Sequence, residues 1–183
     1  MIDNRGVAPQ LDRWLSDPAI RVAHRRPSSA SPESLWQAAR EVELADTRML
    51  GRLIRWRIPG VPGSVTFEGL FRQEPFMVLE ADRSSLISGL VGRIWTLRRD
   101  YPLLHAPEEF REWSTPGTAK VVFGHWVEPD AETGSALRSE TRVKAFGAQG
   151  RLGLASVRPL VRAFEHLVAS DALAAAVRQA EQR

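Results

Sequence analysis

The clearest pattern in the sequence is a run of apolar residues at helical spacing near the C-terminus. It comprises Leu160, Val161, Phe164, Leu167, Val168, Ala172, Ala175 and Ala176, and it predicts one long amphipathic helix. If Ser156 is the N-cap, Pro159 falls in the first turn, where its missing N–H is not needed. The alternative is a start near Arg151 with a kink at the proline. Continued to Gln179, the helix is about 35 Å long, which is enough to cross a sheet.

The first third of the chain predicts one strand and two short helices. The expected elements are a strand over 20–26 and helices over 32–42 and 46–56. In the strand, Ile20, Val22 and His24 share one face, which indicates a half-buried strand. Ser31-Pro32 supplies an N-cap and a proline at the first helical position, so the first helix begins there.

The middle of the chain changes to a strand-like alternation. Strands are expected over 76–80, 86–96, 118–128 and 135–146. The connections at 81–84 and 129–134 are short, polar and rich in turn formers, as antiparallel hairpins require. Residues 101–117 contain several prolines and one candidate helical turn at 107–113. We expect this segment to be a loop or lid over the sheet.

Composition narrows the class of protein. The chain has 183 residues, of which 43% are hydrophobic, so it fits one domain over 1–183 with a polar lead over 1–17. It contains no cysteine, which excludes disulfides, thiolate metal sites and a cysteine nucleophile. The start lacks the order of a signal peptide, and no apolar run of membrane-spanning length occurs. We therefore expect a cytoplasmic protein without stable membrane insertion, either a monomer or a homodimer.

The charge balance argues against a nucleic-acid partner. The pI is near 10.1, but 25 basic and 22 acidic residues leave a net charge of only +3. The high pI reflects the predominance of arginine over lysine among the basic residues. The charges are spread along the chain, and no polybasic arm is present.

The order of these elements resembles that of the helix-grip proteins of the SRPBCC superfamily. The resemblance rests on the strand over 20–26, the helix opening Ser31-Pro32-Glu33-Ser34-Leu35-Trp36, the hairpins over 76–146 and the apolar stripe over 160–176. The superfamily includes START lipid-transfer domains, Bet v 1-like proteins and polyketide cyclases. The resemblance implies an α+β fold in which a curved antiparallel sheet wraps a long C-terminal helix, with two short helices after the first strand. It also implies an internal cavity that holds an apolar small molecule such as a lipid, a quinone or a polyketide-like aromatic.

Two histidines are candidates for orienting such a ligand. His125 shares its side of the strand with Val121 and Phe123, and His24 shares its side with Val22, so both imidazoles are expected to point inward. The alternative is that each is an ordinary core histidine. Glu140 and Arg142 are expected to face solvent. The full set of candidate lining residues is His125, His24, Phe123, Val121, Leu90, Trp95, Thr141, Leu160 and Phe164.

Three functions remain open at this stage. The first is binding or transfer of an apolar ligand. The second is a cyclase, aromatase or hydrolase-like enzyme that uses His125 or another buried polar group as general acid or base. The third is an interaction module that binds an acidic partner or a membrane surface through the arginine face Arg48, Arg52, Arg55 and Arg57. The phosphate-loop, dinucleotide, serine-elbow and zinc-hydrolase motifs are absent, so we expect no cofactor and no metal.

Overall fold

One antiparallel sheet organises the molecule. The computed structural model describes residues 9–47, 49–57, 60–96, 98 and 100–183. Its strands are β1 (Ile20–Ser28), β2 (Met77–Ala81), β3 (Ser85–Gly92), β4 (Ala119–Asp130) and β5 (Gly134–Ala145). They lie in the order β1-β5-β4-β3-β2, so the hairpins β2–β3 and β4–β5 are joined through β3 and β4, and β1 lies at the edge beside β5. The expected strands are all present, with shifts of a few residues at their ends.

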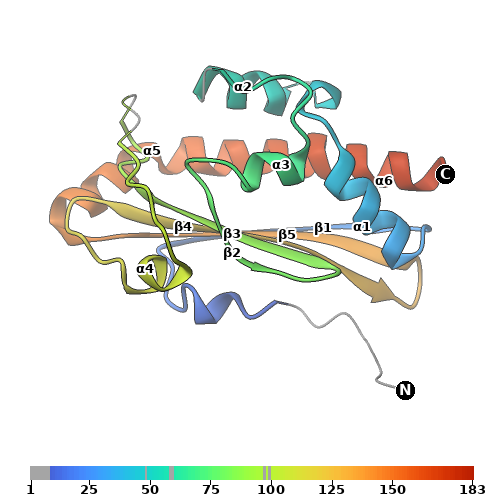
Figure 1. Ribbon diagram of the computed structural model, residues 1–183, viewed down its shortest axis with the longest axis horizontal. Coiled ribbons are helices and arrows are strands. Elements are labelled where there is room, and N and C mark those ends of the chain that lie inside the picture. Colours follow the sequence, from blue (N-terminus) through green and yellow to red (C-terminus); the bar gives the residue numbers. More distant parts are fainter. Residues whose placement is uncertain (1–8, 48, 58–59, 97, 99) are drawn as a thin grey trace.

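Helices cover both faces of this sheet. The helical elements are η1 (Leu11–Arg13), α1 (Pro32–Glu41), η2 (Leu44–Asp46), α2 (Met49–Arg57), α3 (Phe67–Phe71), α4 (Pro107–Glu112), α5 (Gly147–Leu167), the π-helical η3 (Val168–Leu173) and α6 (Ala174–Glu181). The elements α5, η3 and α6 follow one another as a single long C-terminal helix that crosses the sheet (Figure 1). With α1 and α3 it covers the face that we call the helix face, whereas η1 and α4 lie on the outer face. This is the predicted α+β helix-grip arrangement.

The start of the C-terminal helix differs from the preferred prediction. Ser156 does not cap it, because its hydroxyl donates to the Gly153 carbonyl within a helix that already begins at Gly147. Pro159 lies in the interior of α5. Glycine is unfavourable inside a helix, so the glycines of this segment obscure its helical pattern. The packing requires a glycine at position 150, because a Cβ there would lie only 2.9 Å from the Thr118 carbonyl oxygen.

The short helix α3 was not expected from the sequence. Thr66 caps it, since its side chain accepts a hydrogen bond of 3.0 Å from the Gly69 N–H. Its Phe67, Leu70 and Phe71 side chains are buried. A single helical turn of this length is stabilised by tertiary packing and has too few residues to show a periodic pattern.

The outer face of the sheet is covered by residues 9–17 and by α4, which are far apart in sequence. Phe110 of α4 is fully buried there, against the backbone of Gly89 in β3. The buried Lys120 ammonium donates to the carbonyls of Phe110 and Arg111 at 3.1 and 2.9 Å. These bonds fasten the end of α4 to β4. The 101–117 segment therefore passes from the helix face, where Tyr101 lies, to the outer face.

The expectation that Glu140 and Arg142 face solvent was wrong. Both lie on the outer face of β5 but are buried, because residues 9–17 pack over them. The Arg142 guanidinium donates to Glu140 at 2.6 Å, to Asp12 at 2.5 Å and to the Leu15 carbonyl at 2.7 Å. An alternating strand pattern cannot reveal that an N-terminal segment returns to cover its polar side.

Candidate functional site

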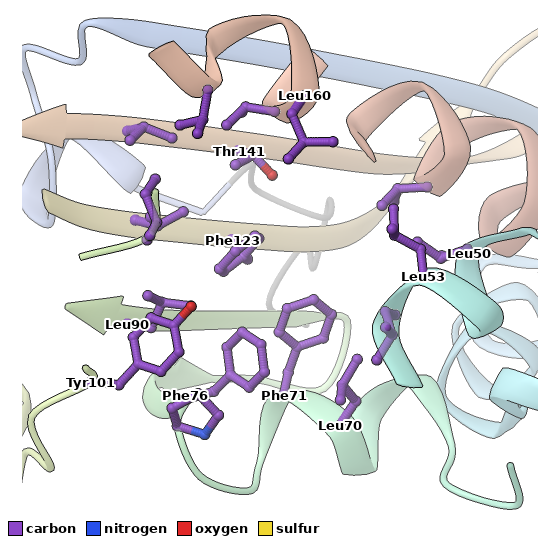
Figure 2. A pocket seen from close by; sticks show the side chains of 18 of the residues that line it. Leu50, Leu53, Leu70, Phe71, Phe76, Leu90, Tyr101, Phe123, Thr141 and Leu160 are labelled. Atoms are coloured by element: carbon purple, nitrogen blue, oxygen red, sulfur yellow. The ribbon is translucent and has the colours of Figure 1, made fainter. Parts of the chain in front are cut away.

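An apolar cavity lies between the helix face of the sheet and the helices above it (Figure 2). Its volume is about 190 Å³. The sheet contributes Leu90, Val121, Phe123, Thr141 and Val143, and the helices and loops contribute Leu50, Leu53, Ile54, Phe67, Leu70, Phe71, Pro75, Phe76, Ile94, Tyr101, Val157, Leu160, Val161 and Val168. The wall thus combines three strands with α2, α3, α5 and the start of η3.

Strand register places the sheet residues of the wall side by side. Leu90 pairs with Val121, and Val121 pairs with Val143, so these three side chains form one row across β3, β4 and β5. In the next row, Phe123 pairs with Thr141. Residues directly opposite in adjacent strands point to the same face, so both rows are directed toward the helices.

The wall has almost no polar character. Its polar side-chain groups are the hydroxyls of Thr141 and Tyr101, and no carboxylate, imidazole or ammonium lines it. The Thr141 hydroxyl points from β5 into the cavity (Figure 2). Within the described part of the chain it makes no hydrogen bond to another side chain or to the backbone. An apolar body is therefore the complementary ligand, with one hydroxyl available on the sheet.

His125 lies beside this cavity and not in its wall. The ring centroids of Phe67 and Phe71 each lie 4.9 Å from the centroid of the His125 imidazole. Both phenylalanines also line the cavity. His125 contributes instead to a second pocket of about 20 Å³ that is also lined by Trp36, Arg40 and Glu68. Burial lowers the pKa of His125 from 6.5 to about 3, so the ring is neutral at physiological pH.

The structure brings five of the nine sequence candidates together. Leu90, Val121, Phe123, Thr141 and Leu160 line the cavity. Trp95 packs against Gly153 of α5 and lies outside the wall. His24 lies on β1 opposite Ser139, also outside the wall. The side chain of Phe164 lies outside the described residues, as do Arg48 and the side chain of Arg57.

The sequence reading missed the contributions of α2, α3 and Tyr101. Phe67, Leu70 and Phe71 form an apolar cluster after the capping residue Thr66, and this cluster was the available signal. Leu50, Leu53 and Ile54 recur at helical spacing in the helix expected over 46–56, but nothing in that pattern indicates which surface they cover. The position of α2 is set by Asp171 of η3, which accepts hydrogen bonds from the Met49 and Leu50 N–H groups at 2.9 and 3.2 Å. Asp171 thereby caps α2 and holds it over the cavity.

The helices beside the cavity expose cationic and apolar side chains together. Leu160 lines the cavity and is still 56% exposed, so the cavity reaches the surface beside α5. Met49, Trp56 and Leu152 are also exposed. The arginines of α2 and α5 with described, at least partly exposed side chains are Arg52, Arg55, Arg151, Arg158 and Arg162. The sequences of these two helices contain a single acidic residue, Glu165.

Comparisons with known proteins do not assign the function. No family model and no curated protein matches the chain. A solved protein structure from Mesorhizobium loti has 16% identity, a TM-score of 0.36, and coverage of 81% of this chain and 93% of that one. A Thermus thermophilus protein has 11% identity, a TM-score of 0.35, and coverage of 88% and 97%. The Zhui aromatase/cyclase from a Streptomyces species has 18% identity, a TM-score of 0.32, and coverage of 90% and 94%. These similarities are too low to identify a ligand or an activity.

Within the described residues, no helix is both long enough and apolar enough to span a membrane. The same residues contain no cluster of three or more His, Asp or Glu side chains placed to hold a metal ion.

Proposed function

We propose that this protein binds a small apolar molecule in the cavity between its sheet and its C-terminal helix. The observation that carries the proposal is the apolar wall of a hollow of about 190 Å³. An apolar cavity of roughly 150 Å³ in another protein stays dry and binds benzene. The volume here therefore suits a substituted single ring or a short acyl chain. Larger members of the lipid, quinone and polyketide classes require the helices to move apart.

Burial supplies the affinity in this proposal. Transfer of apolar surface from water contributes about 25 cal/mol per Å². Empty apolar space already exists in the folded protein, so the ligand does not have to displace packed side chains. The cap that Asp171 places on α2 keeps Leu50 and Ile54 in position over that space.

Binding is better supported than catalysis. A cyclase or aromatase needs a positioned acid or base at the reacting atoms. No carboxylate, imidazole or ammonium lines the cavity, and the neutral His125 is separated from it by the Phe67 and Phe71 rings. The residues of the wall supply shape and burial, and the Thr141 hydroxyl points into the cavity, which suits a carrier or sensor of the ligand.

Titration with propylbenzene tests the proposal. Isothermal titration calorimetry should show saturable binding with one site, and extraction of the purified protein into organic solvent followed by mass spectrometry should release a bound apolar compound. A folded protein that takes up neither propylbenzene nor any other apolar probe of this size, and that releases nothing on extraction, would rule the function out.

A second candidate function is docking on an anionic membrane surface, and the exposed faces of α2 and α5 favour it. Trp56 is 62% exposed and Leu160 is 56% exposed, and both helices carry several arginines. Exposed aromatic and aliphatic groups among cations are typical of helices that lie in the interface of anionic bilayers. The cavity reaches the surface on the same side, so docking there places it next to a source of apolar ligand.

A further inference from the structure

A group of polar side chains lies on the helix face next to the cavity. It consists of Ser88, His125, Ser139, Thr141 and His24, which we call the polar band. In one cross-strand row, Ser88 pairs with Phe123 and Phe123 with Thr141. In the next row, His125 pairs with Ser139 and Ser139 with His24. Thr141 belongs to both the band and the cavity wall.

Ser88 Oγ, Ser139 Oγ and His125 Nε2 of the polar band are buried without a hydrogen bond in the described residues. Ser88 and Ser139 have no exposed surface, and His125 is 5% exposed. Most buried polar groups in native proteins have a partner, because an unsatisfied one costs about 1–3 kcal/mol. Several such atoms in adjacent rows beside an apolar cavity indicate that a partner from outside the chain completes them.

That partner has to be neutral. Burial lowers the pKa of His125 to about 3, so the band offers no cation to a carboxylate or phosphate. The charged side chains that line the small pocket next to His125 are Arg40 and Glu68. They are already paired with each other at 2.5 Å, and Glu68 also accepts from Arg72 at 2.8 Å. A charged group buried here would lack a counterion, which is far more costly than burying a neutral one.

We propose that the cavity recognises amphiphiles with a neutral hydroxyl or carbonyl group. The apolar body lies against Leu90, Val121 and Val143. The polar group bonds to Thr141 and, beyond it, to the Ser139–His125 pair. This inference rests on the proposed function and adds the chemical class of its ligand.

Phe71 controls access to the inner part of the band. Its ring lies 4.9 Å from the His125 ring and 5.2 Å from the Phe123 ring, and it lines the cavity on its other side. Thr141 and Ser139 are two residues apart on the same strand face, so their Cα atoms are about 7 Å apart. A rotation of the Phe71 side chain is the movement that joins the cavity to Ser139 and His125.

Three ligands with a similar apolar body separate the contributions of the apolar body, a neutral hydroxyl and a carboxylate to binding. They are propylbenzene, 4-propylphenol and 4-propylbenzoate. With the wild-type protein at pH 7, calorimetry should give tighter binding of the phenol than of the hydrocarbon by at least about fivefold, which corresponds to one net hydrogen bond. The benzoate should bind most weakly. The ring nitrogen NMR shifts of His125 should change with the phenol and stay constant with the hydrocarbon.

Two substitutions test which side chains bond the hydroxyl group of the ligand. Thr141→Val and Ser139→Ala should each weaken binding of the phenol about fivefold more than they change binding of propylbenzene. Thr47→Val is the matched control, since Thr47 is buried outside the cavity and bonds to the Leu44 carbonyl. Circular dichroism confirms that each variant is folded.

Equal affinity for phenol and hydrocarbon, equal losses for both ligands in Thr141→Val, or tightest binding of the benzoate would each overturn the inference while leaving apolar binding intact. Absence of binding by all three ligands would overturn the proposed function together with it.

Discussion

The backbone of Gly153 in α5 lies directly against the indole ring of Trp95. A Cβ atom on this glycine would be 2.3 Å from the ring, which is closer than any real contact. Trp95 belongs to the loop after β3, so this contact fixes the first half of α5 to one end of the cavity wall. The glycine that weakens the local helical signal is therefore the residue that allows the helix to dock.

Gly153→Ala should destabilise the protein by about 1–3 kcal/mol, the usual cost of overpacking. In an unobstructed helix the same change would stabilise by about 1 kcal/mol. The sign of the change in the free energy of unfolding therefore distinguishes an obstructed glycine from an unobstructed one, and urea unfolding measures it. Gly63→Ala is a suitable control, since a Cβ there would meet only ordinary contacts at 3.7 Å. Unchanged or increased stability of Gly153→Ala would show that Trp95 moves away at no cost.

Much of the fold could be predicted from local pattern. The alternation around Val121 and Phe123 and the helical stripe beginning at Leu160 each depend on neighbours along the chain. The start of α5 could not be predicted, because Gly150 and Gly153 are explained only by the Thr118 carbonyl and the Trp95 ring that meet them. The burial of Arg142 likewise depends on Asp12, 130 residues away in sequence.

The site was predictable to a similar extent. The alternation of side chains along a strand predicted that Val121, Phe123 and Thr141 point inward, and they line the cavity. The same alternation predicted that His125 points inward, but it could not show that Phe67 and Phe71 lie between His125 and the cavity. Those rings come from a five-residue helix whose position is determined by packing and not by periodicity.

Val121→Phe should occupy part of the cavity and weaken uptake of ligand. Val121 lies in the centre of the sheet wall, between Leu90 and Val143 in the register. A larger side chain there enters space that is already empty, so we expect a change in stability below about 1.5 kcal/mol. The affinity for propylbenzene should fall at least about tenfold, since the ligand loses the surface that it buries.

Val177→Phe is the matched control for this experiment. Val177 is half-buried on α6 and does not line the cavity, so its substitution should leave propylbenzene binding unchanged. If Val121→Phe binds propylbenzene as tightly as the wild-type protein, the ligand occupies another site.

The stability of the protein should fall in mild acid because of His125. Burial lowers the pKa of this residue from 6.5 to about 3, so below pH 6.5 the unfolded chain takes up a proton that the folded chain does not. The free energy of unfolding therefore decreases as the pH falls from 7 toward 3. Between pH 7 and pH 5 the loss should be on the order of 2 kcal/mol.

His125→Phe tests this assignment. Urea unfolding at pH 7 and pH 5 should show a much smaller difference for the variant than for the wild-type protein. The nearby Glu68 does not interfere: although burial raises its pKa, hydrogen bonds from Arg40 and Arg72 outweigh that effect and keep the pKa below its usual value. An equal loss of stability in both proteins would assign the acid sensitivity to other groups.

The buried charges of the outer face should contribute unequally to stability. Glu140 is buried and accepts from both Arg142 and Arg21, whereas the Arg21 side chain is 61% exposed. Glu140→Ala leaves Arg142 buried without that partner and should cost about 3 kcal/mol or more. Arg21→Ala removes an exposed partner and should cost below about 1 kcal/mol. Similar losses for the two variants, measured by urea unfolding, would contradict this ranking.

The cationic faces of α2 and α5 allow a direct test of membrane docking. Each arginine near an anionic bilayer contributes about 1 kcal/mol, so reversing two of them should reduce binding to vesicles at least about tenfold. We expect the double variant Arg52→Glu/Arg55→Glu to lose binding to vesicles containing phosphatidylserine in a flotation assay. The matched control is Arg83→Glu/Arg178→Glu, which reverses two exposed arginines in the β2–β3 turn and on α6. Both double variants change the net charge equally, so a difference between them reports the position of the charges. Docking is contradicted if the two variants bind equally, or if the wild-type protein binds pure phosphatidylcholine vesicles just as well.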